Sequence, residues 1–274
     1  MYEIFKTVLT LSVVGGCITA ILLLLKPIAS KRAPAKWQYY IWLAVIVCMI
    51  VPVWKFIPME NVERTSAQAP AIRTEEILET GALPESAIVE DVPMEYREVA
   101  VAPGRSVRIY DLIAYIWFIG MIVFLFLSFG SYAFFLIQKR RTSVEVKENA
   151  VFEEIKREFG IRRRIRLRNS PSITSPLLVG IFRPVVYLPC RNIDDASLNM
   201  VFRHELTHYR RGDLIYKQCA MIVNAIHWFN PMAYLLSANI AESCEISCDM
   251  RVTENMTEAD RTFYMQTILD LIEK

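Results

Sequence analysis

The segment HELTHYRRGD, from His204 to Asp213, contains the residues of this chain whose spacing is best suited to chemistry. The chain has 3 histidines, and two of them, His204 and His208, lie four residues apart around Glu205. On an α-helix, side chains at this spacing project to the same side, one turn apart. Two imidazoles placed in this way can each give one ring nitrogen to a single Zn²⁺ ion. The motif therefore predicts a zinc site of the metallopeptidase type.

Glu205 directly follows the first predicted ligand, where its carboxylate can take a proton from a water molecule on the metal. A zinc ion lowers the pKa of such a water molecule to about 7, so hydroxide is available at neutral pH. Glu205 would then pass the proton to the leaving amine. Motifs of five residues also arise by chance on solvated helices. Here the scarcity of histidine, and a helix with good caps and an apolar face, favour the catalytic interpretation.

A catalytic zinc ion needs a third protein ligand and an open position. The segment ANIAESCEISCDMRV places Glu242, Glu245 and Asp249 on one helix face, at steps of three and four residues. We select Glu245 as the third ligand, with Glu242 as the alternative ligand or a solvated acid of the helix face. Asp249, one turn beyond Glu245, can accept a hydrogen bond from the second nitrogen of a ligating histidine.

The cysteines and the remaining histidine offer weaker candidates. Cys244 and Cys248 are four residues apart and suggest a Cys/His zinc site, which would be closed and structural. None of the 6 cysteines forms a Cys-x-x-Cys motif, so we interpret them as free thiols in a reducing compartment. His227 could help to stabilise an oxyanion at the zinc site, although a hydrogen-bonded structural histidine is the favoured interpretation.

The histidine motif must be carried by a helix that Asp194 or Asp195 caps and that continues through Arg210. Arg211 and Asp213, with Arg210, are interpreted as the charge complement and a cap at its C-terminal end. The apolar stripe of this helix consists of Leu198, Val201, Phe202, Leu206 and Tyr209.

The segment Leu214 to Ile240 joins the two helices and is apolar enough to resemble a membrane span. A single crossing would place His204 and Glu245 on opposite sides of the bilayer, where they could not share one ion. We therefore predict a helix pair that dips into the inner leaflet or packs against other spans, with both ends on one side. Asn230 and Pro231 would be the cap and first residue of its second helix.

Three further stretches, Ile4–Leu25, Trp37–Trp54 and Leu112–Ile137, are apolar and close to the length of about 20 residues that crosses a bilayer. Hydrophobic residues form 54% of the chain, which points to a membrane protein with a polar portion. The formal net charge is only +2, so no global field favours binding to nucleic acid.

Basic residues predict the orientation of these spans. The link between the first two spans contains Lys26, Lys31, Arg32 and Lys36, and the third span is followed directly by Lys139, Arg140 and Arg141. Both places should be cytoplasmic. The N-terminus is then outside the cell. Lys55 to Tyr110, which is acidic and has no sustained periodicity, is then an external flexible loop.

The predicted protein is mostly α-helical, with a small β-hairpin or sheet in a cytoplasmic α+β domain of the zincin type. The spans and domains are predicted at 1–54 for the first two transmembrane helices, 55–110 for the extracellular loop, 111–138 for the third helix and 139–274 for the membrane-associated zinc metallopeptidase domain.

Three segments of the predicted cytoplasmic domain have recognisable patterns. Residues 145–159 have helical spacing. The segment IRRRIRLRNS (161–170) fits a solvated strand or helix edge, or a contact with anionic lipid headgroups. The segment SPLLVGIFRPVVYLP (175–189) is a predicted hairpin with at least one strand at a sheet edge. Such an edge can pair with an extended substrate, or the hairpin can be purely structural.

These motifs resemble a known family. SPLLVGIFRPVVYLP, HELTHYRRGD, HWFNP and ESCEISCD occur in the order seen in the BlaR/MecR family of bacterial β-lactam-sensing antirepressors, which have an integral membrane zinc metallopeptidase domain. The resemblance covers essentially the whole chain and is specific from Ser175 to Asp249. It implies a fold with membrane spans before the zinc motif, as expected here.

The resemblance also implies roles for individual residues. His204 and His208 would be zinc ligands, Glu205 the catalytic base, Glu245 the third ligand and Asp249 a supporting acid. In the family, an antibiotic acylates an extracellular penicillin-binding sensor, and the signal activates the cytoplasmic protease. A BlaI/MecI-type DNA-binding repressor is then lost and resistance genes are expressed. The expected partners are therefore the lipid bilayer and a cytoplasmic repressor, with self-cleavage and oligomer formation as further options.

This sequence departs from that pattern after the predicted zinc helix. It ends at Lys274, with no final span, no sensor and no Ser-x-x-Lys nucleophile motif, which fits a fragment or a sensorless branch. Two alternatives to an antirepressor peptidase follow from the same residues. One is a membrane-protein quality-control or processing zinc protease of the HtpX or CAAX type. The other is a signalling scaffold that zinc only orders.

Overall fold

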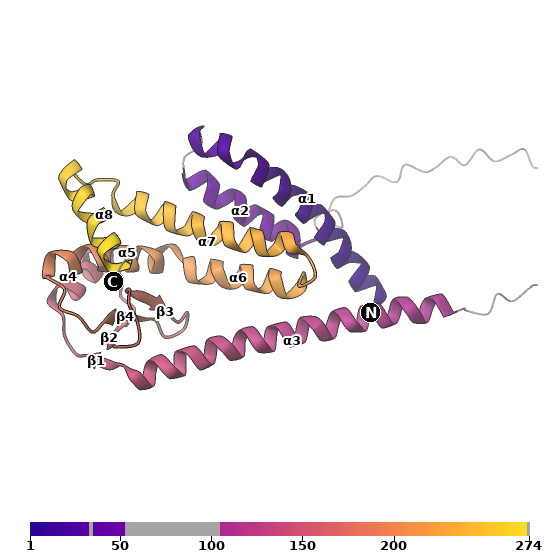
Figure 1. Ribbon diagram of the computed structural model, residues 1–274, viewed down its shortest axis with the longest axis horizontal. Helices are drawn as coiled ribbons and strands as arrows, with labels where there is room; N and C mark the ends of the chain where they lie inside the picture. The colour runs from indigo at the N-terminus through magenta and orange to yellow at the C-terminus, as the bar shows by residue number, and fades with distance from the viewer. Residues whose placement is uncertain (33–34, 53–104, 273–274) are drawn as a thin grey trace, which may run out of the picture.

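The computed structural model describes residues 1–32, 35–52 and 105–272 of the chain (Figure 1). Most of the predicted external loop (55–110) lies outside these residues, and its last part belongs to a helix instead. The elements, in chain order, are α1 (Tyr2–Arg32), α2 (Ala35–Ile50), α3 (Arg105–Thr142), β1 (Val144–Val146), α4 (Ala150–Glu158), β2 (Arg166–Ser170), β3 (Leu177–Val179), β4 (Val185–Pro189), α5 (Asp195–Arg211), α6 (Asp213–Ile226), α7 (Pro231–Val252) and α8 (Glu258–Ile272). The described chain is thus mostly helical with one small mixed sheet.

Two helices of the described residues are long and apolar enough to cross a membrane, over Tyr2–Ile28 in α1 and Ile109–Thr142 in α3. The predicted second span, 37–54, corresponds to α2, whose apolar stretch Trp37–Ile50 is shorter. At about 1.5 Å per residue, such a helix is shorter than the hydrocarbon core of about 30 Å. By length and composition, the described residues therefore contain two candidate spans rather than three.

The predicted helix pair is confirmed by α6 and α7, which lie side by side and are joined by a short turn (Figure 1). The turn ends at Asn230, whose side chain accepts a hydrogen bond from the backbone N–H of Met232, and Pro231 is the first residue of α7. Proline suits this position because the first helical N–H has no partner within the helix. The two helices therefore return to the side from which they start.

The pair α6–α7 packs against α1 and α2. Its buried apolar contacts form one cluster, made of Trp42, Val45, Ile46, Met49, Tyr216, Ala220, Val223, Ala233, Leu236, Ile240 and Cys244. Polar contacts join the same helices: Asn230 Nδ2 donates to Ser12 O at 3.0 Å, and Lys26 Nζ forms an ion pair with Glu242 at 2.6 Å. These contacts bind the N-terminal helices to the part of the chain that carries the metal motif.

The sheet has the order β1-β2-β4-β3, in which β2 and β4 are parallel and the other pairs are antiparallel. The predicted hairpin over 175–189 is confirmed as β3 and β4, and β3 is an edge strand. Gly180, at the turn between them, has a φ of +87°, and a Cβ there would lie 2.7 Å from Arg183 O. Only glycine combines this backbone conformation with so close an approach.

Two predictions for this region are corrected by the structure. Helical spacing over 145–159 was expected, but β1 occupies 144–146 and α4 begins at Ala150. The side chain of Asn149 caps α4 by accepting from Phe152 N at 2.9 Å, which is why the helix begins there. The arginine-rich segment was expected to be a solvated strand or helix edge, or a lipid contact. Arg162 to Arg164 are exposed, but β2, which follows them, is an internal strand with Leu167 buried.

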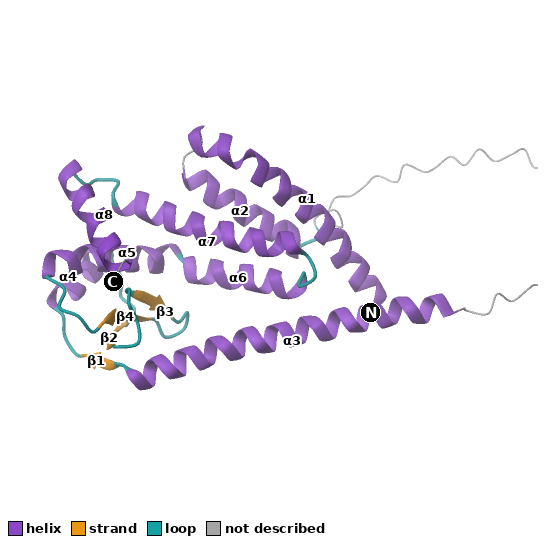
Figure 2. Cartoon of the chain, viewed as in Figure 1, coloured by secondary structure: helices purple, strands orange, loops and turns teal. Residues whose placement is uncertain are grey.

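The sheet is covered on both faces. Helices α4 and α5 bury one side in a cluster that includes Ile155, Val186 and Phe202. On the other side, Val179, Val185 and Tyr187 pack against the C-terminal part of α3. Figure 2 shows the small sheet next to α5 and near the end of α3. The sheet therefore connects the long apolar helix α3 with the helix that carries the histidine motif.

Candidate metal centre

Helix α5 is built as its sequence predicts. Asp194 is its N-cap and accepts a hydrogen bond from Ser197 N at 2.8 Å, and the helix runs through Arg211. Gly212 ends it in the left-handed conformation, with a φ of 76°, and α6 starts at once. Of the predicted stripe, Leu198, Val201, Phe202 and Leu206 are buried and Tyr209 is partly buried. The histidines lie on an adjacent face, and Val201 of the stripe lines the same cavity as both of them.

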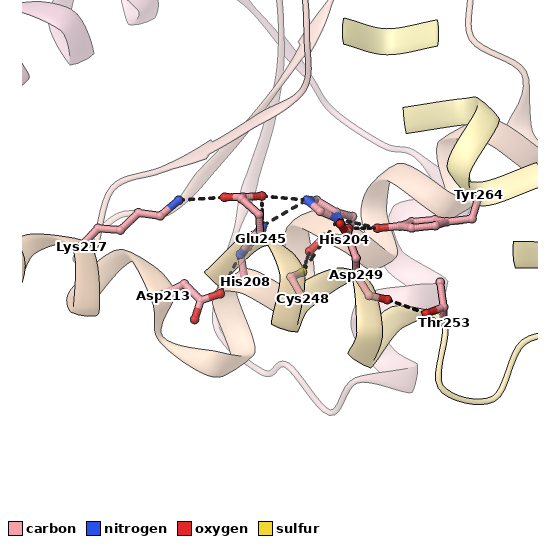
Figure 3. Close-up of polar contacts among 9 residues, drawn as sticks. All are labelled: His204, His208, Asp213, Lys217, Glu245, Cys248, Asp249, Thr253 and Tyr264. Carbon is pink, nitrogen blue, oxygen red and sulfur yellow. Dashed lines mark hydrogen bonds and ion pairs between the residues drawn. The ribbon is translucent and has the colours of Figure 1, made fainter. Parts of the chain in front are cut away.

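The two imidazoles of α5 meet at their Nε2 atoms. His204 Nε2 and His208 Nε2 lie 3.1 Å apart, and the ring planes are nearly perpendicular at 82°. Glu245, on α7, points its Oε2 atom at the same place, 3.3 Å from His208 Nε2 and 3.7 Å from His204 Nε2 (Figure 3). The other carboxylate oxygen, Oε1, lies 3.0 Å from Lys217 Nζ.

These three atoms fit a tetrahedral zinc ion. With bond lengths of about 2.0–2.2 Å, ligand atoms on a tetrahedron are about 3.4 Å from one another. The observed separations among the two Nε2 atoms and Glu245 Oε2 are 3.1, 3.3 and 3.7 Å, which lie on either side of that value. Glu242, the alternative ligand from the sequence, instead pairs with Lys26 at 2.6 Å. The donor set that fits best is therefore His204, His208 and Glu245.

Both histidines are oriented by partners at their other ring nitrogen. His208 Nδ1 donates to Asp213 Oδ2 at 2.7 Å. His204 Nδ1 lies 3.2 Å from Asp249 Oδ1 and 2.7 Å from Tyr264 Oη, and the tyrosine hydroxyl donates to the same Asp249 oxygen at 2.6 Å. A proton on each Nδ1 leaves the Nε2 lone pairs free for a metal. Asp249 thus lies where its predicted supporting role requires.

Three residues of the site were not singled out by the sequence, or were given another role. Asp213 was interpreted as a cap, but its buried carboxylate contacts His208. Its position five residues after His208, across the Gly212 turn, is a signal that could have identified it. Lys217 and Tyr264 come from α6 and α8, and nothing in their local sequence indicates a contact with the motif.

The electrostatics of the site follow from these contacts. Burial disfavours the charged form of His208, but Asp213 and the neighbouring acids outweigh it and raise the pKa of His208 to about 11. Burial acts to raise the pKa of Glu245, yet the two imidazoles and Lys217 hold that pKa well below its usual range. The carboxylates of Asp213, Asp249 and Glu245 around the two imidazoles therefore favour positive charge at the point where the side chains meet.

Glu205 lies next to this point and has a different environment. It is buried, and burial raises the pKa of its carboxyl, while the positive charge of His204 and His208 acts in the opposite direction. A carboxylate with a raised pKa is a better proton acceptor near neutral pH. This environment is compatible with the general-base role that the sequence predicts for Glu205, and the backbone of Leu178 on β3 also hydrogen-bonds to its carboxyl group.

Cys248 is the one competing donor among the described residues. His204, His208 and Cys248 can present ligand atoms that all lie within 4.8 Å of one another. Cys248 Sγ lies 3.8 Å from His204 Nδ1 and 3.5 Å from His204 O, and it also interacts with His208. His204 Nδ1 is already engaged by Tyr264 and Asp249. Glu245 Oε2, at 3.3 and 3.7 Å from the two Nε2 atoms, fits the distances expected for a third ligand, and Cys248 remains the alternative donor.

The helper role considered for His227 is wrong. His227 is fully buried at the far end of α6 from Lys217, and its Nε2 lies 3.1 Å from Met49 O on α2. Along α6, the fourteen steps from Asp213 to His227 span about 20 Å. The favoured alternative, a hydrogen-bonded structural histidine, is what the structure shows.

A cavity of about 370 Å³ opens over the site. Its lining combines the metal-site side chains with strand β3 and helix α8, through residues that include Ser175, Leu177, Leu178, Glu205, Ile268 and Leu271. Because β3 is the sheet edge, its outer backbone groups have no neighbouring strand among the described elements. An extended peptide could therefore lie along β3 with one of its peptide bonds next to Glu205.

Replacing Asp213 by asparagine is expected to lower zinc affinity by roughly 10–100-fold, the usual cost of losing an outer partner of a ligating histidine. Asparagine keeps the size of the side chain but removes the charge that fixes the proton on His208 Nδ1. Competition with a chromophoric chelator would measure the change. Asp194→Asn is the matched control. It makes the same change in the acid that caps the N-terminus of α5, where asparagine can cap the helix equally well. Equal affinities for the two variants would contradict the orienting role.

Comparison with known proteins gives a consistent result. A family model described as BlaR1 peptidase M56 matches residues 6–274. Regulatory protein BlaR1 of Bacillus licheniformis is 29% identical over 161 residues, which cover 56% of this chain and 26% of that protein. Methicillin resistance mecR1 protein of Staphylococcus aureus (strain Mu50 / ATCC 700699) is 22% identical over 270 residues, covering 95% of this chain. The chain spans 45% of the length of that relative.

Proposed function

Because this chain belongs to the BlaR1 peptidase M56 family, we propose that it is an integral membrane zinc endopeptidase of the antirepressor type. Its substrate would be a cytoplasmic protein, either a BlaI/MecI-type repressor or the chain itself. Membership of the family indicates a peptidase, and the relatives' names point to signalling in β-lactam resistance. The observation that carries the proposal is the convergence of His204 Nε2, His208 Nε2 and Glu245 Oε2 beside the buried Glu205.

In the proposed mechanism, His204, His208 and Glu245 would hold the zinc ion. Asp213, Asp249 and Tyr264 would keep the two imidazoles oriented. When bound, the ion supplies Lewis acidity and lowers the pKa of water. Lys217 neutralises Glu245 Oε1 and so leaves Oε2 directed at the imidazoles.

Glu205 carries the proton transfers. As a carboxylate it accepts a proton from the attacking water, and as a carboxylic acid it donates that proton to the nitrogen of the leaving amine. Its burial excludes bulk water, which would otherwise compete for the proton. We propose that the substrate backbone pairs with the edge strand β3, which holds the scissile peptide bond in an extended form beside Glu205.

The membrane orientation in this proposal places the metal centre in the cytoplasm. Lys26, near the end of the apolar part of α1, pairs with Glu242, one turn before Glu245 on α7. Lys139, at the basic end of α3, donates to Ser172 O at 2.6 Å, close to the sheet beside the site. Both basic ends of the apolar helices thus lie on the side of the metal centre. By the positive-inside bias, that side is cytoplasmic.

A scaffold that zinc only orders is the second candidate, favoured by the proximity of Cys248 to both histidines. Binding by that thiolate would give a structural site with no need for Glu205. The two candidates differ in one outcome, since both bind zinc but only the peptidase cuts a protein.

The test is cleavage of a co-purified repressor encoded beside the gene, using the full chain in detergent or nanodiscs. We expect a defined cut, found by mass spectrometry, that a zinc chelator abolishes and that added zinc restores. The reason is that the protein groups alone lack the Lewis acid that activates water. The chain's own integrity should be followed in the same samples, because self-cleavage is the other proposed reaction. Cleavage that persists in metal-free protein would overturn the proposal.

A further inference from the structure

The turn between β3 and β4 lies beside the apolar part of α3. Gly180 N donates a hydrogen bond to Tyr132 Oη at 3.1 Å, while Lys139 Nζ donates to Ser172 O at 2.6 Å. Tyr132 precedes Lys139 by seven residues, which is about 10 Å of helix. Figure 2 shows the loop next to β3 extending toward α3. The turn therefore lies on the apolar side of the basic end of α3.

The tip of this turn is apolar and exposed. Phe182 is 86% exposed, and Ile181 shares a groove with Ile215 on α6, which is 55% exposed. The Arg163 guanidinium donates to Phe182 O, so the arginine-rich segment before β2 is attached to the tip of the turn. Phe182 and the neighbouring groove of Ile181 and Ile215 together give the tip of the turn an exposed apolar surface, which fits an apolar partner.

Positive charge surrounds this apolar tip. The three arginines at 162–164 and Arg183 are exposed, and those at 163, 164 and 183 line one pocket together with Phe182. Within the described part of the chain, none of the four forms an ion pair with an acid. The one acid in that pocket, Glu145, is paired with Arg168 at 3.3 Å. The cluster therefore carries uncompensated charge next to an apolar tip.

We propose that residues 180–183 form a membrane anchor in which Phe182 enters the lipid interface. The arginines at 162–164 and Arg183 then bind the phosphates of anionic lipid headgroups. Two observations favour lipid as the occupant: the turn is continuous with the apolar surface of α3, and its charge is complementary to an anionic leaflet. The inference depends on α3 crossing the bilayer, which is part of the proposed function, and it does not depend on peptidase activity.

The anchor has a consequence for the metal centre. The turn joins β3, which lines the cavity over the site, to β4, which is buried in the middle of the sheet. Lipid contact at the turn would therefore hold the edge strand at a fixed height relative to the membrane surface. A substrate pairing with β3 would then be presented at that height.

Hydrogen–deuterium exchange of the full chain in nanodiscs tests this anchor. The amides of residues 181–183 lie outside the strands, so they should exchange fast in phosphatidylcholine nanodiscs. In phosphatidylglycerol nanodiscs we expect slower exchange there, by roughly fivefold for each arginine that contacts the surface. The slowing should disappear in high salt. It should also be lost in the triple variant Arg162→Gln, Arg163→Gln, Arg164→Gln and reduced in Phe182→Ser.

The matched control is Arg251→Gln, which removes an exposed arginine that already has an acidic partner, Glu254. It should leave the slowing at 181–183 unchanged. Exchange in the α3 segment 112–137 reports separately whether α3 lies in the bilayer, so failure of the membrane assignment is distinguishable from failure of the anchor. Exchange in α5 reports whether each variant is folded. Equal exchange at 181–183 in the two lipids, or equal slowing by inorganic phosphate without anionic lipid, would overturn the inference.

Discussion

Replacing Glu205 by glutamine is expected to reduce peptide cleavage by about 10²–10⁴-fold, the usual contribution of a general acid–base group, while the bound zinc remains. Glutamine has nearly the same shape as glutamate, but its amide cannot accept a proton from water at neutral pH. Glu205 is buried beside the point where His204 Nε2, His208 Nε2 and Glu245 Oε2 meet, and none of these three atoms belongs to it. Loss of activity should therefore be separable from loss of metal.

Cleavage rates and zinc content of the same purified samples measure this separation. The matched control is Glu242→Gln, which makes the same chemical change in an acid whose partner is Lys26. We expect that variant to cut at a rate close to that of the unmodified chain. A Glu205→Gln protein that cuts at the normal rate would remove Glu205 from the mechanism. A protein that has lost its zinc would show instead that Glu205 supports the metal.

The elements that position the motif could be predicted where short-range signals decide the structure. Asp194 caps α5 and Asn230 caps α7 through side-chain bonds to nearby backbone N–H groups, and both bonds depend only on neighbouring residues. Pro231 suits the first position of a helix for an equally local reason. The helix pair followed from a geometric requirement, since His204 and Glu245 had to lie on one side of the bilayer to share an ion.

Elements whose ends depend on distant partners were harder to predict. The strand β1 exists because it pairs with β2, more than twenty residues later, and helical spacing over 145–159 cannot reveal that pairing. Arginine-rich β2 is internal because β1 and β4 flank it, although its composition resembles that of a solvated edge. Tertiary pairing here overrides the local pattern, as it commonly does for short strands.

The same distinction applies within the metal centre. The spacing of His204, Glu205 and His208 is local, and Glu245 could be selected because helix periodicity limits the choices on α7. Tyr264 reaches His204 across sixty residues, and the contact of Lys217 with Glu245 depends on how α6 packs against α7. Nothing in the residues around Tyr264 or Lys217 specifies these contacts. Side chains that orient a site from other elements can therefore be identified only from the structure, whereas the motif itself can be identified from the sequence.

Replacing Glu245 by alanine is expected to lower zinc affinity by roughly 100-fold or more, beyond the 10–100-fold typical of losing an outer partner. The change removes the oxygen that lies 3.3 Å from His208 Nε2 and 3.7 Å from His204 Nε2, and two imidazoles alone leave the site with too few protein ligands. It also leaves Lys217 without its partner, and an unpaired ammonium near the site further repels a cation. Cleavage should fall with metal occupancy at low zinc concentration.

Parallel variants identify the third ligand. Cys248→Ser should bind zinc nearly as well as the unmodified chain if Glu245 is the ligand, because the change then removes none of the three ligand atoms. Lys217→Met separates the two effects of removing Glu245, since it deletes the neighbouring ammonium and keeps the carboxylate. Competition with a chelator, followed by zinc analysis, measures all three variants under the same conditions. If Cys248→Ser lost zinc while Glu245→Ala kept it, the thiolate would be the ligand, and the closed, structural interpretation of this centre would replace the catalytic one.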